Sequence, residues 1–173
     1  MLTLVSGGSA SGKSEYAESL VLSMGPARRL YIATMEIWDG ESRRRVARHR
    51  AMRKDKGFDT LECPRGLAEQ TPVPDCVALL ECMSNLCANE CFGPLGFEGA
   101  AERVLAGVER WNDSARGLVI VTNELFGDGI AYDPGTAQYL DVLAQVNRTI
   151  AARADRVVEV VCGLPVLWKG EAV

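Results

Sequence analysis

Short apolar runs alternate with stretches of helical periodicity along this chain. The apolar runs cover residues 2–5, 29–33, 60–62, 77–80, 118–122 and 156–161. Runs rich in Val, Ile and Leu are typical of strands in a parallel sheet that is buried on both faces. Helical periodicity fits residues 13–23, 41–54, 82–90, 98–114 and 136–153. This alternation predicts an α/β fold whose mostly parallel sheet carries helices on both faces.

The last apolar segment, at 163–168, follows the run at 156–161 too closely for a crossover helix. It should therefore turn back as an antiparallel edge strand, a position where Pro165 is tolerated. No repeat, low-complexity tract or linker interrupts the pattern, and 173 residues are enough to bury one core. We therefore expect a single domain over residues 1–173.

Composition and charge narrow the class of protein. The net charge of −4 at pH 7 argues against a general binder of nucleic acids or anionic membranes. No apolar run has the length of a membrane span, and residues 1–5 lead at once into a glycine-rich loop, as a core strand does and a signal peptide does not. We expect a cytoplasmic protein without nucleic-acid partners and without a membrane span.

The six cysteines raise the question of a metal site. Cys82, Cys87 and Cys91 do not form a C-x-x-C pair, and no histidine lies near them in the sequence. Buried free thiols in a reducing compartment are the favoured interpretation. Because Cys87 and Cys91 would share one face of a helix, a metal or redox pair stays an alternative.

A glycine-rich loop directly follows the first apolar run. It reads, in order, Gly7, Gly8, Ser9, Ala10, Ser11, Gly12, Lys13 and Ser14, which fits the pattern G-x-x-x-x-G-K-S. Between a strand and a helix, its backbone N–H groups and the helix N-terminus form a site for phosphates. Lys13 can then reach the β- and γ-phosphates, and the Ser14 hydroxyl can ligate Mg²⁺. Although a chance match on a turn is the alternative, the loop predicts binding of a nucleoside triphosphate.

Acidic residues end three of the apolar runs. Glu81 closes the run at 77–80, where P-loop proteins place the carboxylate that supports Mg²⁺, although it can instead be an acid at the start of the helix 82–90. The tripeptide 122–124 (Thr-Asn-Glu) either emerges at the phosphate face or caps the following loop, and the sequence favours neither. Glu62 ends a weaker run, and position alone does not favour a functional role for it.

His49 is the only histidine, and the stretch 43–54 around it holds seven of the nineteen basic residues. On a helix, Arg45 and Arg53 lie one turn to either side of it. Neighbouring cations disfavour the imidazolium form, and a neutral ring can attack phosphorus. The same arginines can hold a polyphosphate. A surface histidine on a solvated helix is the alternative, which the residues alone do not exclude.

Several of these segments, in this order, resemble the bifunctional adenosylcobinamide kinase / adenosylcobinamide-phosphate guanylyltransferase family of cobalamin biosynthesis. The resemblance extends over nearly the whole chain, and its most diagnostic parts are the R-V-A-R-H-R-x-x-R stretch at 45–53 and the V-T-N-E segment at 121–124. Further matching segments are 7–18, 31–34, 79–82, Asn147, 154–155, 163–165 and 169–170.

The resemblance implies a P-loop α/β fold with an antiparallel C-terminal edge and a trimeric assembly. It implies that His49 becomes guanylylated and that the nucleotide site includes the loop 7–14 with its catalytic Lys13. The other residues it assigns to that site are Thr34, Met35, Glu36, Arg50, Ala51, Met52, Arg53, Glu62 and Glu81. Ser14 and Glu81 are the residues we expect to support Mg²⁺.

The expected reactions use ATP or GTP to phosphorylate cobinamide and then transfer GMP from GTP through a GMP–histidine intermediate, which gives adenosyl-GDP-cobinamide. The chain departs from the family at 129–134, in the arginine-free helix 136–147 and at Lys54, where the family usually has proline. Two rival functions stay open: a P-loop kinase of another small molecule, with His49 as a bystander, and a non-catalytic nucleotide-binding regulatory protein.

Overall fold

The computed structural model describes residues 1–37, 39–127 and 129–171, and at positions 41, 45, 49, 52 and 53 it describes the backbone alone. The strands are β1 (Leu2–Ser6), β2 (Arg29–Ala33), β3 (Phe58–Glu62), β4 (Val77–Glu81), β5 (Gly117–Val121), β6 (Arg156–Val161) and β7 (Leu164–Lys169). The helices are α1 (Lys13–Ser23), α2 (Gly40–Arg53), α3 (Met83–Cys91), α4 (Ala100–Ser114), α5 (Pro134–Arg153) and the short 3₁₀ helix η1 (Leu67–Glu69).

The strands form one sheet in the order β3-β2-β4-β5-β1-β6-β7. Every neighbouring pair is parallel except β6 and β7, which are antiparallel. The predicted edge strand is therefore confirmed, and so is the P-loop NTPase-type α/β class. In this order β5 lies between β1, which leads into the glycine-rich loop, and β4, which ends in Glu81.

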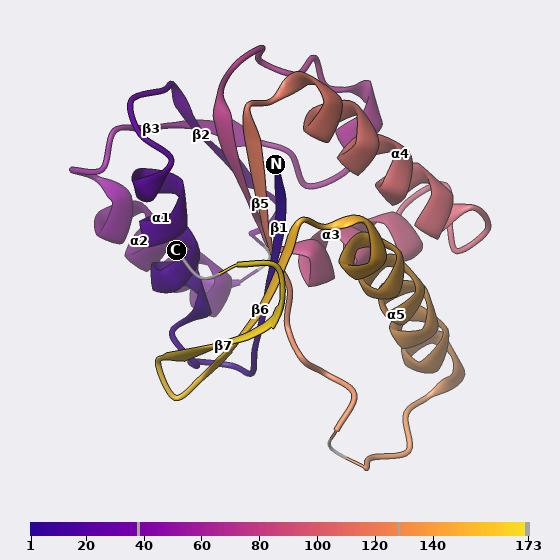
Figure 1. Cartoon of the computed structure of the whole chain (residues 1–173). Helices are drawn as coiled ribbons and strands as arrows, with labels where there is room; N and C mark the ends of the chain where they lie inside the picture. The colour runs from indigo at the N-terminus through magenta and orange to yellow at the C-terminus, as the bar shows by residue number, and fades with distance from the viewer. Residues whose placement is uncertain (38, 128, 172–173) are drawn as a thin grey trace.

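The helices cover both faces of the sheet, with α1 and α2 on one side and α3, α4 and α5 on the other (Figure 1). Side chains alternate along each strand, so Leu4 packs in the cluster with α3, α4 and α5 while Val5 packs with α1. The first cluster also encloses Trp111 of α4, which is fully buried. α2 differs from the other long helices because none of its described side chains is buried.

Local signals explain where the helices begin. Asp39 and Ser42 form a reciprocal capping box at the start of α2. Asp133 accepts hydrogen bonds from the backbone N–H groups of Gly135 and Thr136, and Pro134 follows it as the first residue of α5. α5 therefore begins two residues before the expected 136. β3 begins at Phe58, also two residues before the expected 60, and the short η1 lies between β3 and β4.

All six cysteines are free, and five of them are buried, whereas Cys162 is exposed. Burial raises the pKa of the Cys91 thiol to about 11 and raises that of Cys87 still further. Among the described residues no three His, Cys, Asp or Glu side chains gather as a metal site would require. None of the described helices combines the length and apolar character needed to cross a bilayer.

Candidate active site

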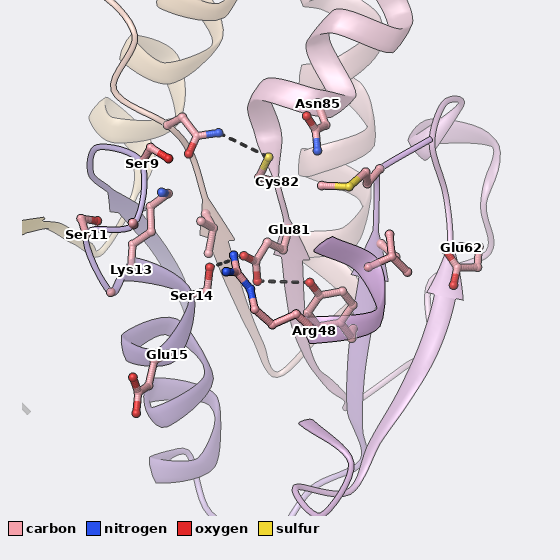
Figure 2. Close-up of a pocket in the computed structure, with 18 residues that line it drawn as sticks. Ser9, Ser11, Lys13, Ser14, Glu15, Arg48, Glu62, Glu81, Cys82 and Asn85 are labelled. Atoms are coloured by element: carbon pink, nitrogen blue, oxygen red, sulfur yellow. Dashed lines mark hydrogen bonds between the residues drawn. The ribbon is translucent and has the colours of Figure 1, made fainter. Parts of the chain in front are cut away.

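A cavity of about 620 Å³ opens at the carboxyl ends of the parallel strands, between the glycine-rich loop and α2. Figure 2 shows Ser9, Lys13 and Ser14 on one side of it, Glu62 on the opposite side, and Glu81 between them. The expected residues that line it are Ser9, Ala10, Ser11, Gly12, Lys13, Ser14, Met35, Glu62 and Glu81. They come from separate parts of the sequence, and the sheet brings them together, as the rule for open α/β sheets predicts.

The glycine-rich loop is shaped by close contacts that only glycine allows. A Cβ atom on Gly7 would stand 2.6 Å from the Ser11 Oγ and 2.7 Å from the Val160 carbonyl oxygen. Gly12 caps α1 in the left-handed conformation, with φ of 92°. The Lys13 Nζ donates to the Gly8 carbonyl oxygen at 2.9 Å, and the lysine is only 8% exposed. A buried ammonium group and a helix N-terminus thus face the same cavity.

Glu81 lies at the centre of the cavity and is held by two hydroxyl groups. The Ser14 hydroxyl donates to its Oε1, and the Tyr31 hydroxyl donates to its Oε2 at 3.2 Å. The carboxylate therefore faces the glycine-rich loop and not the start of α3, which has Cys82 as its N-cap. Mg²⁺ prefers such oxygen donors together with substrate phosphates, so Ser14 and Glu81 fit the ion in chemistry and position.

Thr34 is fully buried and does not line the cavity. Its hydroxyl accepts from the Cys82 N–H at 2.7 Å and donates to the Cys82 carbonyl oxygen at 2.8 Å. The Asn89 amide donates to the carbonyl oxygens of both Thr34 and Pro64, at 2.8 and 2.9 Å. These bonds tie together the residues that follow β2, β3 and β4.

Two ion pairs involve the acidic residues expected at the nucleotide site. Arg50 bonds Glu62 at 2.7 Å on the exposed rim of the cavity, and Arg65 bonds Glu36 at 2.8 Å. Glu62 lines the cavity, whereas Glu36 and Arg50 do not. In the exposed pair of Arg50 and Glu62, the two charges partly neutralise each other.

The basic helix α2 forms part of the cavity wall through Val46 and Arg48. His49 belongs to this helix, one residue after Arg48 and three after Val46. Its side chain is outside the described part of the structure. The same holds for the side chains of Met52 and Arg53. Ala51, Gly7 and Gly8 do not line the cavity.

The segment that follows β5 has three different environments. Thr122 is buried, and no described residue bonds its hydroxyl oxygen. Asn123 lines the cavity and donates from Nδ2 to the Ser84 Oγ at 2.6 Å. Glu124 accepts from the Phe126 N–H at 2.9 Å and so caps the loop. The two interpretations of this tripeptide thus apply to different residues of it.

Several cavity residues did not follow from the sequence. They are Glu15, Tyr31, Ala33, Val46, Arg48, Cys82, Asn85 and Val121. Strand position points to Val121, which ends β5, and the alternation of side chains places Tyr31 on the same face of β2 as Ala33 at its carboxyl end. No local motif marks Val46 or Asn85, whose place depends on how the helices pack. Burial raises the pKa of the Cys82 thiol, so this group contributes no charge to the cavity near neutral pH.

The model of the cobinamide kinase / cobinamide phosphate guanyltransferase family matches residues 3–167. The chain belongs to this family. It is 34% identical over 177 residues to the bifunctional adenosylcobalamin biosynthesis protein CobP of Pseudomonas aeruginosa, covering 99% of each chain. It is 35% identical over 186 residues to the bifunctional adenosylcobalamin biosynthesis protein CobU of Salmonella typhimurium, covering 98% of this chain and 100% of that protein.

A solved structure from Pyrococcus horikoshii is similar in fold, with a TM-score of 0.50 at 9% identity. The likeness covers 99% of this chain and 87% of that chain. At this identity it supports the α/β architecture and no functional detail. The family membership confirms the resemblance recognised from the sequence, and with it the assignment of the chain as a kinase and nucleotidyltransferase of cobalamin biosynthesis.

Proposed function

We propose that this member of the cobinamide kinase / guanylyltransferase family performs both of the family's transfers at the one cavity, within a single transferase domain. The observation that carries the proposal is the placement of a complete phosphate-binding loop, a carboxylate and a basic helix around one space. Lys13, Glu81 and Arg48 all line it. A triphosphate bound there is bounded by cations on two sides, which suits transfer from either its γ- or its α-phosphorus.

In the kinase reaction the phosphates lie against the loop 7–14, and Lys13 exchanges its bond to Gly8 for a contact to the β- and γ-phosphates. Its charge stabilises the negative charge that develops on the leaving diphosphate of ATP or GTP. The hydroxyl of the cobinamide side arm attacks the γ-phosphorus as the bond to the bridging oxygen breaks. We assign the Mg²⁺ contacts to Ser14 and Glu81, where the ion would neutralise phosphate charge.

In the guanylyl transfer His49 attacks the α-phosphorus of GTP, and pyrophosphate leaves with the electrons of the broken bond. Cobinamide phosphate then attacks the same phosphorus, which releases His49 and gives adenosyl-GDP-cobinamide. Two displacements spare the acceptor, which is an anion, from meeting a fully charged triphosphate. The place of residue 49 beside two cavity-lining positions of α2 supports this role, as does the basic surrounding sequence.

We further propose a cytoplasmic, trimeric enzyme. Six free thiols suit a reducing compartment. The outer edge strand β7 exposes Leu164 and Trp168, at 70% and 69%, which suits contact with another copy. Sedimentation equilibrium measures the number of chains directly, and a monomer at micromolar concentration would contradict the assembly.

Incubation of the protein with [α-³²P]GTP tests the proposed function. Acid-labile, base-stable label on the protein, transferable to adenosylcobinamide phosphate, is the expected result. Transfer of the γ-phosphoryl group without such label would instead support a P-loop kinase in which His49 is a bystander. Neither reaction, with nucleotide bound, would support a non-catalytic nucleotide-binding protein.

A further inference from the structure

Asn123 lines the cavity just beyond the carboxyl end of β5. It follows β5, the strand between the one that leads into the glycine-rich loop and the one that ends in Glu81. Val121 is in register with Glu81, and the N–H of Glu124 donates to the Gly7 carbonyl oxygen at 3.0 Å. Asn123 is thus held between the start of the loop and the Glu81 strand end, and it lines the cavity with Ser9 and Lys13.

The amide of Asn123 is oriented by the residues behind it. Its Nδ2 donates to the Ser84 Oγ at 2.6 Å and contacts the Cys82 Sγ at 3.7 Å. The Cys82 Sγ and the Ser84 Oγ also form a hydrogen bond with each other at 3.1 Å, and both residues are buried. Because the two N–H groups are directed to this buried pair, the Oδ1 is the atom left for the cavity, and among the described residues none bonds it.

A carbonyl oxygen at this position distinguishes between the two acceptors. It carries partial negative charge, so it repels phosphate oxygens but accepts a hydrogen bond from a hydroxyl group. The kinase reaction brings a hydroxyl. The guanylyl transfer brings a phosphate monoester, which is mostly unprotonated near neutral pH.

From this asymmetry, and resting on the proposed function, we infer that Asn123 positions the acceptor hydroxyl for phosphoryl transfer and contributes little to guanylyl transfer. The hydroxyl donates to the Asn123 Oδ1, which directs an oxygen lone pair at the γ-phosphorus. The new O–P bond forms as the bond between the γ-phosphorus and the β–γ bridging oxygen breaks, and the nucleoside diphosphate leaves with that electron pair. An amide is too weak a base to keep the proton, which passes to the transferred phosphoryl group and then to water.

The test compares both reactions in the same preparation of each variant. Phosphorylation of adenosylcobinamide is followed with [γ-³²P]ATP, and guanylyl transfer with [α-³²P]GTP and adenosylcobinamide phosphate. Asn123→Ala should lower kcat for phosphorylation on the order of 100-fold, the effect of losing acceptor alignment. The KM for the nucleotide and the extent of GMP labelling should stay close to those of the wild type.

Two further variants separate positioning from a structural role. Asn123→Asp restores an acceptor oxygen but adds a negative charge near the phosphates, so its kcat for phosphorylation should exceed that of Asn123→Ala while the KM for the nucleotide rises. Ser84→Ala frees the amide to rotate and should give a smaller loss of phosphorylation, with no additional loss in the double variant with Asn123→Ala. If Asn123→Ala fails to fold, Ser84→Ala alone still tests the inference, because it should lower phosphorylation and leave guanylyl transfer unchanged.

Glu124→Ala is the matched control, because the neighbouring residue caps the loop and does not line the cavity. It should leave the ratio of the two activities unchanged. Equal losses of both activities in the Asn123 variants, or unchanged phosphorylation in Asn123→Ala, would overturn the inference. A wild-type protein without phosphoryl transfer would instead contradict the proposed function itself, so the two failures are distinguishable.

Discussion

Thr34 and Cys82 hold each other by two hydrogen bonds, from the Cys82 N–H to the Thr34 Oγ1 at 2.7 Å and from that hydroxyl to the Cys82 carbonyl oxygen at 2.8 Å. The N–H of Thr34 also donates to the Glu81 carbonyl oxygen at 3.1 Å. These bonds join the ends of β2 and β4 directly behind Glu81. A residue that does not line the cavity therefore helps to fix the carboxylate that does.

Thr34→Val should destabilise the protein although it preserves the shape of the side chain. The Cys82 carbonyl oxygen keeps a partner, because the Leu86 N–H donates to it at 3.1 Å, but the buried Cys82 N–H loses its acceptor. An orphaned buried donor costs about 1–3 kcal/mol of the free energy of unfolding. Urea titration measures this cost, and Thr34→Ser, which keeps the hydroxyl, is the control. Equal stability of Thr34→Val and the wild type would show that the N–H finds another partner.

Lys13→Ala should abolish both transfers, because each of them needs the phosphates held in the same loop. Loss of a charge that stabilises the transition state costs on the order of 100- to 1000-fold in kcat. Thermal unfolding should be little changed, since the lysine contacts the Gly8 carbonyl oxygen and not the hydrophobic core.

Lys169→Ala is the control for the removal of a lysine, because Lys169 bonds the carbonyl oxygens of Ala151 and Ala152 at the far end of α5. It should retain both activities. Undiminished turnover in Lys13→Ala would contradict the assignment of the loop as the triphosphate site.

Glu81→Gln should shift the magnesium dependence of both reactions to higher concentration by removing the negative charge of the expected ligand. Tyr31→Phe keeps that charge but removes the hydroxyl that bonds Oε2, and loss of such an outer partner costs about 10-fold or more in metal affinity. Titration of activity with MgCl₂ should therefore rank the wild type, Tyr31→Phe and Glu81→Gln in that order. Identical titrations would mean that the Glu81 carboxylate does not support Mg²⁺ and serves only its hydrogen bonds to Ser14 and Tyr31.

The fold could be predicted closely because its signals are local. The continuous apolar residues of β4 and β5 specify buried strands, and the short connection between β6 and β7 leaves room only for a tight turn. The errors lie where the pattern is weak. Phe58 and Asp59 belong to β3, which is an edge strand of the sheet. The polar Asp59 interrupts the apolar run there, so the sequence pattern does not mark the first two residues of the strand.

The candidate site could be predicted only in part, since two kinds of information define it. The glycine-rich loop and the strand-end acid Glu81 follow from motif and position, whereas Glu62 follows only from the resemblance to the family. The contribution of Tyr31 to Glu81 depends on β2 and β4 being neighbours, which the order of strands along the chain does not specify. The separate environments of Thr122, Asn123 and Glu124 depend on how the chain leaves the sheet, which no residue type in the tripeptide determines.

His49→Asn should separate the two activities in the direction opposite to the Asn123 variants. Transfer of a γ-phosphoryl group to a hydroxyl relies on positioning and charge and needs no protein nucleophile. Guanylyl transfer through a covalent intermediate does need one. GMP labelling and guanylyl transfer should therefore disappear, while phosphorylation of adenosylcobinamide remains measurable. The measurements are the same two radiolabel assays, with Arg43→Ala as the control for an exposed change on the same helix.

The alternative outcomes for His49 differ in what they contradict. Guanylyl transfer near the wild-type rate in His49→Asn would rule out the covalent route, because asparagine cannot form the phosphoramidate. Equal loss of both activities with GTP still bound would make His49 a shared phosphate ligand, since a ligand serves every triphosphate whereas a nucleophile serves only the guanylyl step. Loss of guanylyl transfer alone is the result expected if His49 forms a bond to the α-phosphorus. That bond can be checked directly by mass spectrometry, as a GMP adduct on the peptide that contains residue 49.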